Sequence, residues 1–332
     1  MDVTEEQVSV KGDRKLVKPA IYAGLVIIVA LFPLFITSSF HLHLFILTFI
    51  YIIVASSWRT IAISGQMSLG HAGFMGIGAY ASAILAIELG WTPWLTMPLG
   101  GFVAMAIAFI VGYPFTRLRA IYFAMVSLFF GAWLLYLNSV LSKWTGGFTG
   151  LMGIPPVFTG PDSRQYYFYF FLGLTVLSLL VLRRLEICRI GTTWKAIAQS
   201  YLVASSVGIN EARQRILILA VGSFFAGLAG AGYAHYSLLL AHTSFNVLAS
   251  IYMVIYVFVG GIGSFAGPIV GTAVLILIPE YFSELKEFVP FLYAGILLIV
   301  VYTMPQGLAG LPEQIITWVR GRREGKGVTR AS

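Results

Sequence analysis

The sequence predicts an all-α membrane protein, a polytopic bundle of about ten transmembrane helices. Of its 332 residues, 58% are hydrophobic and only 10% are charged. Soluble domains carry about 25% charged residues, so most of this chain is expected to lie in lipid. Long apolar runs recur along the chain and are separated by shorter polar segments. The single cysteine, Cys188, excludes an intrachain disulfide.

Ten apolar segments of about the length of a membrane helix can be placed along the chain. They are residues 20–37, 41–57, 61–88, 91–113, 120–140, 166–182, 216–238, 247–262, 266–282 and 288–304. We expect the first to be retained, because the polar stretch before it is long and no clear cleavage site follows. The third is rich in glycine and is expected to be broken. The predicted division is a tail (residues 1–19), a transmembrane domain (20–311) and a basic tail (312–332).

The distribution of Lys and Arg predicts how these segments are oriented. With an inner N-terminus and ten spans, 18 of the 21 basic residues fall on one side. Lys143, Arg164 and Lys286 fall on the other. This positive-inside pattern places both termini and the interval 183–215 in the cytoplasm. The net charge of +8 is therefore attributed to cytoplasmic loops and not to nucleic-acid binding.

The interval 183–215 is the longest polar stretch after the N-terminal tail. Thr193 is placed to cap a short helix that Gly208 would end. One mildly apolar face of this helix, over residues 194–207, carries Trp194, Ile197, Ala198, Tyr201 and Ser205. The segment is too short and too polar to span a bilayer, so it is expected to rest on lipid or to dock on a partner protein.

Small residues spaced four apart predict close helix crossings, because association in lipid depends on close packing of small side chains. Two such sets occur: Gly222, Ala226 and Gly230, and Gly263, Gly267 and Gly271.

Two glycine-interrupted apolar stretches, residues 64–80 and 259–273, are candidates for the translocation path. Gln66, Ser68 and His71 lie in the first, and a histidine at membrane depth faces the protein interior or a cavity. The alternative is that the three are packing residues bonded to neighbouring backbone. The sequence leaves both interpretations open.

Signatures of catalysis and of ion coupling are missing from the sequence. It contains no HExxH, no GxSxG and no paired carboxylates within a span. We therefore expect no enzymatic activity, no hydrolysis of ATP, no cofactor and no metal. No Asp, Lys or Arg lies in the middle of a predicted span, which argues against an ion-coupled secondary carrier. That carrier, and a non-transport membrane protein, are kept as alternatives.

From residue 52 to residue 311 the chain resembles the permease subunits of branched-chain amino acid ABC importers. The strongest stretch is residues 64–80, SGQMSLGHAGFMGIGAY, which is close to the family pattern SGQLSLGHAAFFGIGAY. Further similar stretches follow in the family's order: 122–131 (YFAMVSLFFG), 145–155 (TGGFTGLMGIP), 223–234 (SFFAGLAGAGYA), 259–271, Pro279-Glu280 and 305–311 (PQGLAGL).

The resemblance implies an importer-type ABC transmembrane domain in a prokaryotic plasma (inner) membrane. Its implied partners are a second permease subunit, as hetero- or homodimer, two cytoplasmic ATPase subunits that bind ATP, and an extracytoplasmic solute-binding protein. Membrane lipid surrounds the chain, and no nucleic acid is expected. Specificity in such systems lies largely in the binding protein. Urea, short amides and other amino acids therefore stay open as cargo beside branched-chain amino acids.

The resemblance also carries over individual residues. Residues 189–208 match the family's coupling loop, which fits the surface of the ATPase. The residues that match it are Gly191, Trp194, Ala196, Ile197, Ala204 and Gly208. Relatives usually carry a basic residue and acids where this chain has Ala198, Ser200 and Tyr201. The polar part of the contact with the ATPase is therefore expected to be reduced.

On the opposite side, residues 141–165 form a connection rich in glycine and proline that is long for a helical bundle. It is expected to be a structured loop and not a span. Long loops often bind a partner, so we expect docking of the binding protein here, with Thr145, Gly146, Gly147 and Gly150 as candidate residues.

Overall fold

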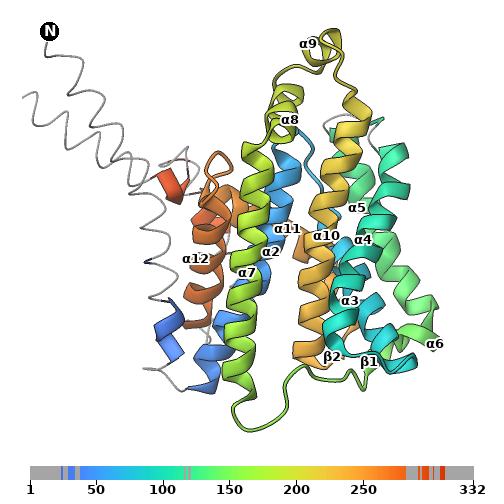
Figure 1. Ribbon diagram of the computed structural model, residues 1–332, viewed down its shortest axis with the longest axis vertical. Helices are drawn as coiled ribbons and strands as arrows, with labels where there is room; N and C mark the ends of the chain where they lie inside the picture. The colour runs from blue at the N-terminus through green and yellow to red at the C-terminus, as the bar shows by residue number, and fades with distance from the viewer. Residues whose placement is uncertain are drawn as a thin grey trace, which may run out of the picture.

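The computed structural model describes residues 24, 29–33, 38–115, 117–118, 121–281, 291, 294–298, 302 and 307–310 (Figure 1). Most of the predicted spans 20–37 and 288–304, and both tails, lie outside the described residues. The elements are α2 (Ser39–Ala62), α3 (His71–Glu88), α4 (Pro93–Phe115), α5 (Ile121–Val140), α6 (Ser142–Thr145), η1 (Gly147–Thr149), β1 (Leu151–Met152), α7 (Ser163–Ile187), α8 (Arg189–Gln199), α9 (Tyr201–Ser206), α10 (Glu211–Ser237), β2 (Leu239–Leu240), η2 (His242–Phe245), α11 (Val247–Gly260), α12 (Gly267–Tyr281) and η4 (Leu308–Gly310).

The described part of the chain is helical, apart from one two-stranded ladder and the connections. Within it, five helices are long and apolar enough to cross a membrane: α2, α4, α5, α7 and α10. The helices α11 and α12 are apolar but shorter. The all-helical membrane class is thus confirmed. The count of about ten spans stays a prediction.

Long helices run side by side along the bundle, and its two ends carry different elements (Figure 1). The helix α10 packs against α3 and α4, and α2 packs against α7. The pair α11 and α12 packs against α2. The short helices α8 and α9 lie at one end, and β1, β2 and α6 lie at the other. By the predicted orientation, the end with α8 and α9 is cytoplasmic and the other end is outer.

The predicted break within residues 61–88 is confirmed. The helix α2 ends at Ala62, and α3 begins at His71 after a turn. Glycine is needed at position 70, because a Cβ there would overlap the backbone carbonyl of Ser127 on α5. The Ser127 hydroxyl also accepts a hydrogen bond of 2.9 Å from the amide of Leu69. The break therefore lets the chain lie directly on α5.

The small residues of α10 form the crossings that their spacing predicts. A Cβ on Gly222 would overlap Ile61, and one on Gly230 would overlap the carbonyl of Met75. The α12 set is confirmed for Gly267 and Gly271, which lie against the backbone of the α11 segment. Gly263 has open space beside it and makes no such crossing.

At the outer end of the bundle, hydrogen bonds between neutral groups connect α10 to its neighbours. They centre on His235, a buried residue of α10. Its Nδ1 donates to the carbonyl of Pro155 at 2.8 Å. Its Nε2 lies 2.9 Å from the hydroxyl of Ser82 on α3 and 3.1 Å from that of Thr96 on α4. Close by, β1 pairs antiparallel with β2, with Leu151 opposite Leu240. The loop before α7 is thereby fastened to the end of α10.

Candidate functional site

The turn between α7 and α8 is closed by Gly191. A Cβ at this position would overlap the backbone carbonyls of Leu185 and Glu186 at the end of α7. Cys188, between the helices, is extended with φ −65° and ψ 169° and serves as the N-cap residue of α8. The last turn of α7 and the first turn of α8 are therefore in backbone contact, so displacement of α8 acts directly on α7.

Trp194 is the largest residue on the buried face of α8. The indole is fully buried, and its Nε1 donates to the side-chain oxygen of Gln214 on α10 at 3.1 Å. Ile197 on α8 and Ala204 on α9 are also buried. Ala196 is half-buried, and Gly208 is exposed. Most of the residues that match the coupling loop thus hold the two short helices on the bundle.

Two details of the predicted helix are wrong. Thr193 lies inside α8, where its hydroxyl donates to the carbonyl of Arg189, so it is not a cap. The expected single helix is two helices, separated at Ser200, which is extended (φ −158°, ψ 109°) and caps α9. Ser200 changes the direction of the chain, so Ser205 on α9 is exposed instead of sharing the buried face of α8. Ala198, on α8 itself, is also exposed, which the expected face did not predict. Gly208, with φ +84°, follows α9 as expected.

Aliphatic side chains are exposed on α9 and directly after it. Leu202, Val203 and Val207 are 64%, 64% and 72% exposed. Ser205 and Ser206 are exposed beside them. The helix α9 lies at the tip of the bundle (Figure 1). We call Leu202, Val203 and Val207 the apolar tip; none of the three was among the candidate residues taken from the sequence. The sequence signal was three aliphatic residues within six positions of a mostly polar interval.

A group of charged residues behind α8 was also missed. Arg59, at the end of α2, forms an ion pair with Glu186, at the end of α7, with a distance of 2.8 Å. Lys195 on α8 forms a second ion pair with Glu186, at 2.9 Å. A signal was available, since Arg59 is the only charged residue between Lys18 and Glu88. We call Arg59, Glu186 and Lys195 the charged cluster.

The three candidates for the translocation path lie buried around the break between α2 and α3. The Nε2 of His71 is 2.9 Å from the hydroxyl of Ser57, and the indole of Trp58 donates to the carbonyl of Ser68 at 2.6 Å. Among the described residues, no group bonds the Gln66 amide, the Ser68 hydroxyl or the Nδ1 of His71. These buried polar atoms lie within the break between α2 and α3 and at the start of α3.

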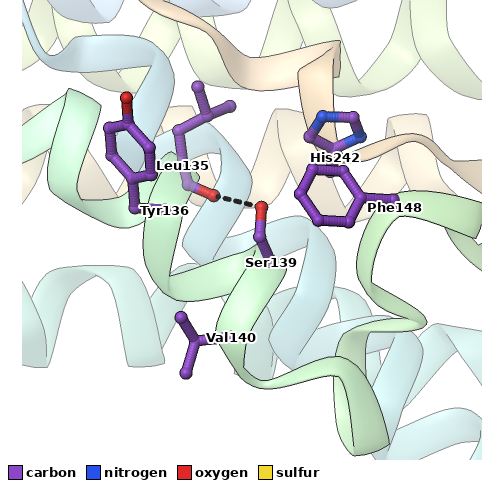
Figure 2. Close-up of a pocket in the computed structure, with 6 residues that line it drawn as sticks. All are labelled: Leu135, Tyr136, Ser139, Val140, Phe148 and His242. Carbon is purple, nitrogen blue, oxygen red and sulfur yellow. Dashed lines mark hydrogen bonds between the residues drawn. The ribbon is translucent and has the colours of Figure 1, made fainter.

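The outer loop is ordered as expected, but its candidate residues are mostly internal. Thr145, Gly147 and Gly150 are buried, and Gly146 has the left-handed conformation that ends α6. Phe148 and Thr149, which lie between these candidates, are exposed, Phe148 to 77%. Its ring meets that of His242 edge to face, with centroids 5.0 Å apart. Figure 2 shows both rings above α5, where Leu135, Tyr136, Ser139 and Val140 complete a pocket of about 390 Å³.

Within the described residues, no group of three or more His, Cys, Asp or Glu side chains could hold a metal ion. The features that stand out in the described residues are a bundle of long apolar helices, an apolar tip at one end and a glycine-shaped loop at the other. The bundle is that of a multi-pass membrane protein.

Comparison of the sequence with known families identifies the family. The family described as "Branched-chain amino acid transport system / permease component" matches residues 40–304. The chain belongs to this family.

Curated relatives agree with this assignment. The chain is 28% identical to the high-affinity branched-chain amino acid transport system permease protein LivM of Salmonella typhimurium and of Escherichia coli, over 95% of this chain and 80% of each relative. It is 25% identical to the permease protein LivH of Salmonella typhimurium, over 79% of this chain and 92% of the relative. No solved structure matches.

Proposed function

We propose that this chain is the membrane permease subunit of an ATP-binding cassette importer for branched-chain amino acids. One observation carries the proposal: the family match covers the bundle and both short helices that project from its end. Of the two kinds of relative, the LivM proteins align with more of the chain. The second permease subunit is accordingly a LivH-like protein.

The apolar tip of α9 docks on a cytoplasmic ATPase. Leu202, Val203 and Val207 supply the exposed area for this contact. Gly191, Trp194 and Ile197 hold the two helices on the bundle. Two such ATPase subunits bind ATP, and this chain holds no cofactor. Relatives usually carry a basic residue and acids at the positions of Ala198, Ser200 and Tyr201. Without those charges, the contact of this chain with the ATPase is mainly apolar.

The opposite end receives the solute-binding protein. The exposed side chain of Phe148 and the pocket beside His242 offer an apolar contact (Figure 2). Thr145, Gly146, Gly147 and Gly150 shape the loop that presents Phe148. Gln66, Ser68 and His71 join the translocation path when the helices around the α2–α3 break separate. Their buried polar atoms without partners among the described residues support this role.

The transmembrane domain occupies residues 20–311 of a bacterial inner-membrane protein with both termini in the cytoplasm. The positive-inside distribution of Lys and Arg supports this orientation. Transport is driven by ATP in the partner subunits. In the described helices every Asp or Glu lies within two residues of a helix end, so the middle of the described spans offers no acid for ion coupling.

Reconstitution tests the proposal. The chain is purified with its partner permease, ATPases and binding protein and placed in liposomes, and uptake of radioactive leucine is measured. Uptake should require ATP and the binding protein and should persist with an ionophore. Uptake by the chain alone, driven by a cation gradient, would contradict the proposal. A binding protein that prefers urea to leucine would keep the importer but change the cargo.

A further inference from the structure

The carboxylate of Glu186 has two basic partners on different elements. The guanidinium of Arg59 approaches it through both terminal nitrogens, at 2.8 and 3.3 Å. Lys195 reaches the oxygen Oε1 at 2.9 Å. The exposed fractions of the Arg59, Glu186 and Lys195 side chains are 4%, 12% and 48%. The charged cluster therefore joins α2, α7 and α8 at a single carboxylate.

Arg59 also holds the turn between α11 and α12. Its Nε donates to the backbone carbonyl of Ile262 at 2.9 Å. Its guanidinium carbon lies 5.7 Å from the centre of the Phe265 ring, and that of Arg183 on α7 lies at the same distance. All three nitrogens of the Arg59 guanidinium are thus used, two on α7 and one on this turn.

The ends of the α11–α12 turn are closely packed, whereas Gly263 in its middle has open space beside it. A Cβ on Gly267 would overlap the carbonyl of Gly261, and a Cβ on Gly307 would overlap the backbone of Gly261. Gly261, next to Ile262, is therefore in direct backbone contact with the first residue of α12. A displacement of Ile262 acts on the start of α12 through this contact.

The three members of the cluster differ in what they do for stability. A buried arginine needs its counter-ion, so the bond between Arg59 and Glu186 is required by the fold. Lys195 is half exposed, and an exposed ion pair adds little to stability. Its attachment to Glu186 instead fixes where α8 lies relative to the Arg59–Glu186 pair.

We propose that the charged cluster is the joint through which movement of α8 and α9 reaches the α11–α12 turn, with Lys195, Glu186 and Arg59 as positioning residues. The inference rests on the proposed function, because it takes α9 to be moved by an ATPase. When α8 moves, Lys195 pulls the Glu186 carboxylate, and Arg59 passes the displacement to Ile262. These side chains affect how ATP hydrolysis is coupled to transport, and they do not contact the cargo.

The test uses the complete importer in liposomes and the variant Lys195→Gln. The matched control is Arg213→Gln, which removes the same charge from an exposed residue at the start of α10, near the same end. Leucine transported per ATP hydrolysed should fall at least threefold in Lys195→Gln and stay unchanged in the control. Lys195→Arg, which keeps the ion pair, should restore most of the wild-type ratio. The yield of assembled complex should be equal in all of them.

A distance measurement distinguishes a loss of movement between α8 and the α11–α12 turn from a loss of ATPase binding. Spin labels are attached at Gln199, which is exposed at the end of α8, and at Gly263, which has open space beside it, in a chain with Cys188 replaced by serine. ATP should shift the distance between the labels in the otherwise wild-type chain, and Lys195→Gln should reduce that shift.

If Lys195→Gln left unchanged either the leucine transported per ATP or the ATP-induced change in label distance, the proposal about the charged cluster would be wrong. ATP-driven uptake by the wild type would in that case still support the proposed function. Failure of the wild-type complex to use ATP for uptake would overturn the proposed function itself.

Discussion

The two ends of the bundle are held together by different chemistry. At the end with α8, the charged cluster joins three helices through ion pairs of 2.8 and 2.9 Å. At the outer end, His235 joins α3, α4 and the loop at Pro155 through hydrogen bonds between neutral groups. A two-stranded backbone ladder adds to the outer end.

This difference suits the two ends to different duties. The attraction between opposite charges falls slowly with distance, so an ion pair persists when its partners shift slightly. A hydrogen bond between neutral groups weakens steeply once its distance and angle change. The charged end can therefore transmit a displacement without coming apart. The neutral hydrogen bonds at the outer end favour a fixed shape, which suits the proposed docking of a binding protein there.

The largest expected effect comes from breaking the charged end. Glu186→Leu leaves the buried guanidinium of Arg59 without a counter-ion, which should cost about 3–5 kcal/mol of stability. The measurement is the free energy of unfolding by denaturant in detergent. The double variant Arg59→Met with Glu186→Leu should recover most of the loss, because it removes both charges. A double variant as unstable as the single one would contradict this account.

Breaking the outer end should have a smaller effect. His235→Leu removes the donor to the Pro155 carbonyl and the acceptor for Ser82 and Thr96, at a cost of about 1–3 kcal/mol. Unfolding in detergent measures it, and His242→Leu, on the rim of the pocket, should change stability by less than about 0.5 kcal/mol. Leucine transported per ATP should stay unchanged in His235→Leu. A lowered ratio would remove the distinction between the two ends.

The smallest expected effect comes from a change in the apolar tip. Leu202→Asp places a charge on the apolar surface of α9, and affinity for the ATPase should fall about tenfold, or about 1.4 kcal/mol. Thr192→Asp, which adds the same charge to an exposed position of α8, serves as control and should bind normally. Binding is measured with purified permease and ATPase. Equal affinities for both variants would show that α9 is not the contact.

Hydropathy was enough to predict the helices of the bundle. The break after Ala62 and the division between α11 and α12 follow from glycine-rich stretches in apolar segments. Such features are local, so the sequence contains them directly. The end of α8 could not be predicted in the same way, because Ser200 and Thr193 have the same capping chemistry and the local sequence does not distinguish them.

Contacts between distant parts of the chain could not be predicted. Arg59 and Glu186 are 127 residues apart, and no periodicity links them. The strands β1 and β2 are each only two residues long, which is too short for an alternating pattern. Phe148 lies in a stretch of glycines, whose pattern predicts a turn-rich loop but not which side chain the loop exposes. Its exposure became visible only once the loop was folded.

The pairing of Leu151 with Leu240 has a consequence for biogenesis. A ribosome that has just delivered β1 to the translocon has not yet synthesised β2. Every helix between them, α7 to α10, must be made before this ladder can form. The ladder is therefore completed only after α8 and α9 have been synthesised. A chain truncated before Leu239 would contain α8 and α9 but would lack the strand that pairs with β1.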